Sequence, residues 1–162
     1  MLFCSFSNPL HIFEEAFKAL SDGGVLEIQD VIFEFRSFDD NSDSLKGSAL
    51  EDWAKRLKDA FGSRGIDLTC ASSYKNHLET VGFEDIKQKE FLWPIGTWPE
   101  KKNLKEWGQW CQMDILDMLE AISIVPLTEH GPHRMSQQAV EVLLARVRKD
   151  LRNPSIHAHL IL

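Results

Sequence analysis

Apolar residues recur at helical spacing directly after Asn8-Pro9, a pair that favours the start of a helix because asparagine caps it and proline fits its first turn. Gly23-Gly24 ends this pattern, and a strand-like segment from Val25 to Phe33 follows, which is largely apolar up to Asp30 but is interrupted by Glu27, Gln29 and Asp30. Such a run predicts a strand that is covered on both faces. A helix, a glycine pair and a strand in this order are typical of an α/β fold. The apolar helical positions are Ile12, Phe13, Ala16, Phe17 and Leu20.

The same unit occurs again farther along the chain. Ser48 and Glu51 form a capping-box pattern ahead of an amphipathic helix that Gly62 ends. A shorter helix is expected over residues 74–81, with Gly82 as its stop, and a strand is expected from Phe83 to Trp93. The repetition strengthens the α/β prediction.

After Pro99 the pattern becomes helical. It predicts one long helix over residues 104–122 and a second that begins at Ser136 and ends before Asn153-Pro154. The alternating residues 156–162 then predict a last strand. The apolar face of the long helix, which we expect to lie in the core, comprises Trp107, Cys111, Ile115, Met118 and Ile122.

Composition narrows the class of protein. The chain has 162 residues, of which 43% are hydrophobic, enough for one globular domain with its own core. Its formal net charge of −7 argues against nucleic-acid binding, which needs a basic face, and no apolar run is long enough to cross a bilayer. The three cysteines, Cys4, Cys70 and Cys111, are widely spaced, which favours a reducing compartment over a disulfide framework.

Several motifs, spread over nearly the whole chain, resemble the C-terminal half of class I S-adenosylmethionine (SAM) methyltransferases, and in particular the fungal LaeA-like group. The more specific of them is a Pro-Ile-Gly-x-Trp-Pro segment followed by a glycine-containing tryptophan helix. The motifs are Phe17-Lys-Ala-Leu-Ser-Asp-Gly-Gly-Val-Leu-Glu-Ile-Gln-Asp30, Val81-Gly-Phe83, Trp93-Pro-Ile-Gly-Thr-Trp-Pro99, Lys105-Glu-Trp-Gly108 and Val147-Arg-Lys-Asp-Leu151 through Ile156-His-Ala158.

This resemblance implies an α/β fold that corresponds to the C-terminal half of a Rossmann-like class I methyltransferase sheet. Residues 25–31 would be its fifth strand, residues 83–93 its sixth, and residues 156–162 the beginning of its seventh. Residues 1–162 would form a single partial methyltransferase-like domain, with a helical insertion at about 101–152 between the last two strands.

The chain departs from the family in its glycines. SAM sites of this kind use a glycine-rich loop, because only glycine lets the backbone approach the cofactor closely. No two glycines here are separated by a single residue, so no G-x-G is present. We therefore expect the SAM-binding half to be missing and the chain to be inactive alone. The glycines are at positions 23, 24, 47, 62, 65, 82, 96, 108 and 131.

Four residues are candidates for a site. Gln29 and Asp30 are expected at the carboxyl end of the fifth strand, where α/β sheets hold ligands, and could contact the SAM cofactor. Alternatively, they cap the strand and hydrogen-bond the following loop. Trp93 and Trp98 could line a pocket for a flat or apolar substrate, or could simply belong to the core. The sequence identifies no catalytic residue, and its histidines and cysteines lack zinc-binding spacing, so no metal is expected.

Two hypotheses for function follow. In the first, implied by the resemblance, the protein is a SAM-dependent methyltransferase of fungal secondary metabolism or its regulation, with a small-molecule substrate. In the second, it is a catalytically inactive remnant or accessory subunit. Without a fourth strand, residues 25–31 would be an unpaired apolar edge that aggregates, is covered by Met1 to Phe6, or pairs with a protein partner or a second copy. The family resemblance leaves cytoplasmic and nuclear locations open.

Overall fold

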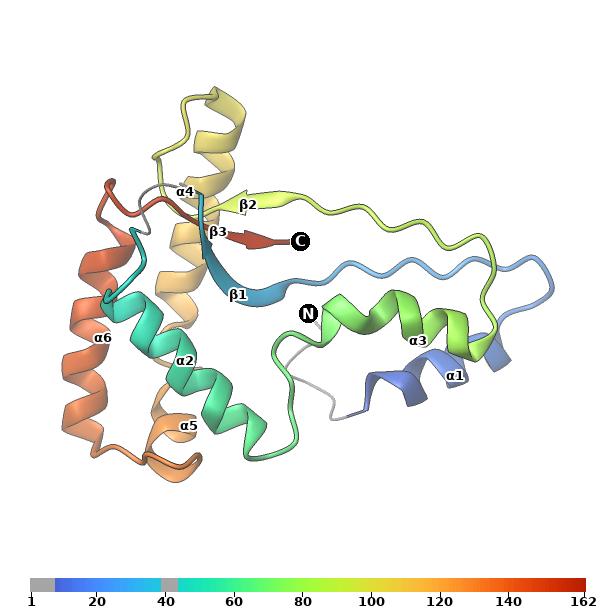
Figure 1. The fold of residues 1–162 in the computed structure, drawn as a ribbon, viewed down its shortest axis with the longest axis horizontal. Coiled ribbons are helices and arrows are strands. Elements are labelled where there is room, and N and C mark those ends of the chain that lie inside the picture. The colour runs from blue at the N-terminus through green and yellow to red at the C-terminus, as the bar shows by residue number, and fades with distance from the viewer. Residues whose placement is uncertain (1–7, 39–43) are drawn as a thin grey trace.

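The computed structural model describes residues 8–38 and 44–162 as an α/β fold with a small sheet (Figure 1). Met1 to Phe6, the proposed cover of the fifth strand, lie outside these residues. The elements, in chain order, are α1 (Pro9–Ala19), β1 (Ile32–Ser37), α2 (Ala49–Gly62), a short 3-10 turn (Cys70–Ser73), α3 (Tyr74–Val81), β2 (Leu92–Pro94), α4 (Lys102–Met118), α5 (Ile124–Glu129), α6 (Gln137–Leu151) and β3 (Ala158–Ile161).

The three strands form one sheet in the order β1-β3-β2. The last strand lies in the centre and runs antiparallel to both neighbours, so β1 and β2 point in the same direction. Ile161 of β3 stands opposite Ile32 of β1 on one side and opposite Leu92 of β2 on the other. The sheet therefore depends on the strand that comes last in the chain.

The first two strands are shorter than predicted. The strand expected from Val25 to Phe33 begins only at Ile32, and the one expected from Phe83 to Trp93 begins only at Leu92. Residues 25–31 are not covered on both faces either, because the Val25 side chain is 85% exposed. The physical reason is pairing: both segments lose their strand partner where β3 ends.

Helices α2, α4, α5 and α6 gather beside the sheet, at the left of Figure 1. The helix α2 starts as its capping box predicts, with the Ser48 hydroxyl accepting a hydrogen bond from the Glu51 amide. A second anchor comes from α6, where the Asp150 carboxylate accepts from the amide of Ala49. In the core, Trp53 of α2 donates from its indole nitrogen to the Ser123 hydroxyl at 2.8 Å, which satisfies both buried groups.

The helices α1 and α3 form a separate pair at the other end of the molecule (Figure 1). Phe13 of α1 packs edge-on against Tyr74 of α3 with ring centroids 5.1 Å apart. Phe17 meets Phe83, just beyond α3, at 4.9 Å. This pair therefore joins the segment that precedes β1 to the segment that precedes β2.

The Pro-Ile-Gly-x-Trp-Pro segment is explained by a close contact between two glycine backbones. Gly96 follows β2 with a left-handed φ of +89°, and its amide donates to the carbonyl of Gly108 in α4 at 2.9 Å. A Cβ added at Gly108 would overlap the carbonyl oxygen of Gly96. Glycine at position 108 thus lets α4 lie directly against the end of β2.

One core prediction for α4 is wrong. Cys111 and Ile115 are buried as expected, but Trp107 is 47% exposed. The close backbone contact at Gly108 turns that part of the helix face toward Gly96, so the neighbouring indole ring remains at the surface. No helix among the described residues is long and apolar enough to span a membrane.

We predict that Gly108→Ala destabilises the protein by about 1–3 kcal/mol or more, because the added methyl group must push α4 away from Gly96. The measurement is the urea midpoint of unfolding. Gly62→Ala is the matched control, since an added Cβ there meets no atom within 4 Å, and we expect it to stabilise by about 0.5–1 kcal/mol. Equal midpoints for the two variants would contradict the proposed contact.

Candidate functional site

A cluster of aromatic and histidine side chains lies where β1 and β2 end and β3 begins. The Trp98 ring stacks on His157 with centroids 5.1 Å apart and an interplanar angle of 21°. Phe38, directly after β1, lies 4.8 Å from Trp98 and 6.3 Å from His159. Open α/β sheets hold their ligands at the carboxyl ends of parallel strands, so this aromatic–histidine cluster occupies the position expected for a site.

Hydrogen bonds to the backbone of β3 fix this cluster in place. The carbonyl of Ala158 accepts from the indole nitrogen of Trp98 at 3.1 Å and from the amide of Ile95 at 2.9 Å. The carbonyl of His157 accepts from the amide of Phe38 at 2.8 Å. The hydrogen bond from the Trp98 indole therefore fixes the connection between β2 and α4 to β3.

His159 is the buried polar residue of the cluster. Its side chain is 8% exposed, and its Nδ1 atom has no hydrogen-bond partner among the described residues. Burial lowers the pKa of His159 below its ordinary value, and the positive charge of Arg36, which stands opposite it on β1, lowers it further. The ring is therefore held neutral at physiological pH, with a nitrogen free to take part in one hydrogen bond.

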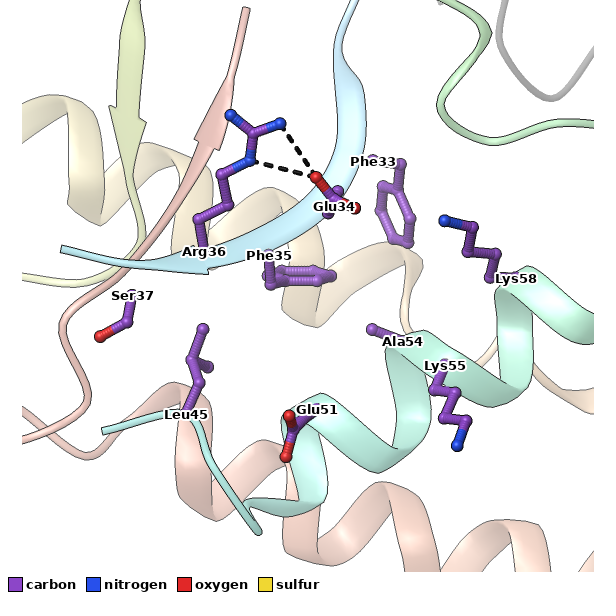
Figure 2. Close-up of a pocket in the computed structure, with 10 residues that line it drawn as sticks. All are labelled: Phe33, Glu34, Phe35, Arg36, Ser37, Leu45, Glu51, Ala54, Lys55 and Lys58. Carbon is purple, nitrogen blue, oxygen red and sulfur yellow. Dashed lines mark hydrogen bonds and ion pairs between the residues drawn. The ribbon is translucent and has the colours of Figure 1, made fainter. Parts of the chain in front are cut away.

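A groove runs beside this cluster between β1 and α2 (Figure 2). Phe33, Phe35 and Ala54 supply its apolar surface. Glu34 and Arg36 form an ion pair of 2.9 Å on the strand, and Lys55 and Lys58 line the helix side. The remaining lining residues are Ser37, Leu45 and Glu51.

The predicted cofactor residues lie elsewhere. Gln29 and Asp30 precede β1, so they are at its amino end and not at its carboxyl end, and neither lines the groove. The Asp30 carboxylate accepts from the Tyr74 hydroxyl at 2.8 Å and from the Val31 amide at 3.0 Å. Gln29 is exposed and donates to Glu27 at 2.7 Å. The strand begins later than predicted, which accounts for the different position.

The two predicted substrate residues are partly buried, on β2 and just beyond it. Trp93 pairs with Leu160 in the ladder, whereas Trp98 enters the cluster described above. The structure brings neither of them next to Gln29 or Asp30, because Trp93 and Trp98 lie on β2 and just beyond it, whereas Gln29 and Asp30 precede β1. Within the described residues the two pairs therefore lie apart, one before β1 and the other on β2 and just beyond it.

The described residues supply few reactive groups. Cys70 and Cys111 are buried and free, and burial raises the pKa of both thiols, that of Cys111 to about 12. Neither is a thiolate nucleophile at neutral pH. Among residues 8–38 and 44–162, no group of three or more His, Cys, Asp or Glu is placed to hold a metal ion. The chemistry available at the cluster is therefore stacking and hydrogen bonding.

Comparison with known proteins shows which proteins this chain is similar to. The chain is 25% identical over 148 residues to the probable methyltransferase tdiE of Emericella nidulans, a match that covers 91% of the chain and 45% of the relative. It is 28% identical over 122 residues to the protein-methionine methyltransferase laeA of Chaetomium globosum, over 75% of the chain and 37% of the relative. It is 30% identical over 112 residues to the secondary metabolism regulator LAE1 of Cochliobolus heterostrophus, over 69% of the chain and 36% of the relative.

The chain is related to the LaeA-like methyltransferases. It spans less than half the length of each of these three relatives. No family model matches the chain. No solved structure matches it either.

Sequence reasoning missed most members of this aromatic–histidine cluster. Phe38 was not singled out because it follows the predicted strand and precedes an acidic loop. His157 and His159 alternate in a strand pattern, which was the available signal that they lie on one face, but they were weighed only as metal ligands. Tyr74, the partner of Asp30, comes from a helix 44 residues farther along the chain.

We predict that stability falls as the pH is lowered from about 7.5 toward 5, partly because of His159. Its folded pKa lies below the unfolded value of about 6.5, so the unfolded chain binds more protons between the two values. The stabilisation is present above pH 6.5 and is lost as the pH falls through the folded pKa. The measurement is the urea midpoint of unfolding as a function of pH.

The substitution His159→Gln should make this pH dependence shallower between pH 7 and 5, because it removes one titrating group. His133→Gln, at an exposed position, is the control and should leave the slope unchanged. The same slope in both variants would show that His159 does not titrate abnormally.

Proposed function

We propose that this chain contributes one portion of a SAM-dependent methyltransferase-like domain that acts in fungal secondary metabolism or its regulation, and that it does not bind SAM by itself. The observation that carries the proposal is the similarity to tdiE over 91% of the chain. The names of the other relatives, a protein-methionine methyltransferase and regulators of secondary metabolism, support the same class of function.

In this proposal the three strands take the places of the last three strands of the family's sheet, although β1 (Ile32–Ser37) begins directly after residues 25–31, where the resemblance predicts the fifth strand. We assign β1, β2 and β3 to the fifth, sixth and seventh strands of a class I methyltransferase, with α4, α5 and α6 as the insertion between the last two. Residues 1–162 then act as one partial domain, and its substrate is a small molecule. The parallel direction of β1 and β2, with a cluster of aromatic rings at their carboxyl ends, supports this assignment.

The residues present do not fit SAM on their own. The Asp30 carboxylate is already engaged by Tyr74 and Val31, and the Gln29 amide by Glu27. The two residues also lie away from the groove between β1 and α2. Since the chain has no G-x-G loop, the main contacts to the cofactor would come from another segment or chain.

Within a complete site, we propose that Gln29 and Asp30 face the cofactor and that Trp93 and Trp98 face the substrate. The Tyr74 hydroxyl orients the Asp30 carboxylate, so in a complete site that carboxylate would be shared between Tyr74 and the cofactor. Trp98 is suited to stacking because its ring already lies against His157 and is half-buried, with part of its surface open.

A second candidate function is that of an inactive accessory subunit that pairs with another chain through β1. The favouring observation is that β1 is an edge strand of the sheet. This edge is partly occupied, because the Phe33 amide donates to the Leu68 carbonyl at 3.1 Å. A partner, or a second copy, would pair beyond that contact.

The test is calorimetric titration with S-adenosylhomocysteine, with size exclusion to record the oligomeric state. We expect no binding by the chain alone, and binding by the chain when it is co-purified with the part of the Emericella nidulans relative that it does not match. Asp30→Asn should then weaken binding about tenfold, because a charged hydrogen-bond acceptor is lost. Asp22→Asn, at an exposed position after α1, is the control and should leave the binding of S-adenosylhomocysteine unchanged.

The outcomes distinguish the two functions. Binding by the chain alone would show that a cofactor site exists without the glycine-rich loop. If neither form binds, and the chain elutes as a dimer or with a partner, the methyltransferase proposal is overturned in favour of the accessory subunit.

A further inference from the structure

The outer face of α4 carries three large apolar side chains that remain exposed in the described part of the chain. Trp107 is 47% exposed, Trp110 is 59% exposed and Met113 is 46% exposed. Their spacing of three residues makes them neighbours along the helix, on the side away from Gly108 and Ile115, which are buried. Neighbouring exposed side chains of this size are typical of a surface that contacts another protein.

The charged residues of α4 are distributed against the helix macrodipole. Acidic side chains are favourable at the N-terminus of a helix and basic side chains at its C-terminus. In α4 the first turn has no acidic residue and the last turn has no basic one. Instead, Lys102 and Lys105 lie near its start, and Asp114 and Asp117 lie near its end. The stability of the isolated helix therefore does not explain this distribution of charge.

These two lysines and two aspartates are also exposed and unpaired. Within residues 8–38 and 44–162, none of the four forms an ion pair with another side chain. With Lys101 and Glu106 included, the first half of the helix keeps a net positive charge. Trp110 is the middle residue of α4 (Lys102–Met118). The surface therefore has a positive end, an aromatic centre and a negative end.

We propose that a second copy of this chain packs on this surface, with the two α4 helices antiparallel and related by a twofold axis near Trp110. The lysines at the start of each helix then lie opposite the aspartates at the end of the other, and the exposed tryptophan and methionine side chains meet between them. A parallel arrangement would bring like charges together, so charge complementarity selects the antiparallel one. Such an interface is isologous, as in twofold dimers, which are the commonest oligomers.

The position of α4 keeps this surface separate from the open edge of β1. The helix packs against β2, which is the strand at the opposite edge of the sheet. In Figure 1 the first turns of α4 rise above β2. The proposal therefore differs from pairing through β1, and it does not depend on cofactor binding.

The first test is sedimentation velocity of the full chain at about 1–200 µM. One helix packed against another buries less than about 1,200 Å², so we expect a monomer–dimer equilibrium with a micromolar dissociation constant. Trp110→Glu should weaken dimerisation at least tenfold, because two carboxylates would then meet near the twofold axis. Val142→Glu is the matched control, since Val142 is 64% exposed on α6, and should leave the dissociation constant unchanged.

Two outcomes of this first test would overturn the proposal. One is a chain that remains monomeric over the whole concentration range. The other is a dimer that the α4 and α6 variants weaken equally.

An exchange of charges tests the antiparallel register. One variant carries Lys102→Glu and Lys105→Glu, and the other carries Asp114→Lys and Asp117→Lys. Each alone should dimerise at least tenfold more weakly, because like charges then lie opposite each other. An equimolar mixture should dimerise as the unchanged chain does, since every lysine again lies opposite a carboxylate.

Circular dichroism checks that both charge variants are folded. Each exchange improves the fit of the charges to the helix dipole, so we expect neither variant to lose helix content. Weaker dimerisation then reports the interface and not the fold. Dimerisation that is unchanged in the single variants, or that does not recover in the mixture, would overturn the proposal.

Discussion

The pairing of β3 with both β1 and β2 is the constraint on which the rest of the structure depends. The two outer strands do not contact each other in the ladder, and each is ordered as a strand only over the residues that face β3. Because β3 is the last element in the chain, its pairing with β1 and its pairing with β2 each close a loop of more than 60 residues. Closing such loops costs entropy, which the helices packed beside the sheet must offset.

Close backbone contacts and caps hold those helices in place. The hydrogen bond from Gly96 to Gly108 brings α4 against the end of β2, and the Asp150 carboxylate joins α6 to the start of α2. The indole of Trp53 and the Ser123 hydroxyl satisfy each other inside the core. These contacts link elements far apart in sequence, so they position the carboxyl ends of β1 and β2 as a unit.

That positioning brings together side chains with complementary chemistry. Trp98, His157 and Phe38 present aromatic surface, and the buried neutral ring of His159 lies against Phe38 with its Nδ1 atom available. The groove between β1 and α2 adds positively and negatively charged side chains along β1. In the proposed methyltransferase this surface would face the parts of the domain that the chain itself does not supply.

By itself, the sequence determined the α/β class, the approximate limits of the helices other than α5, and the relation to LaeA-like methyltransferases. Those features depend on local signals, such as the Ser48 capping box, the stop at Gly82 and the Pro-Ile-Gly-x-Trp-Pro motif. Only the tertiary structure decided where β1 begins, that Trp107 is exposed, and that Asp30 meets Tyr74 instead of the strand end. The physical reason is that a strand exists only where a neighbour pairs with it, and that burial depends on which backbone approaches a helix face. Both conditions involve residues distant in the chain, which periodicity and spacing do not record.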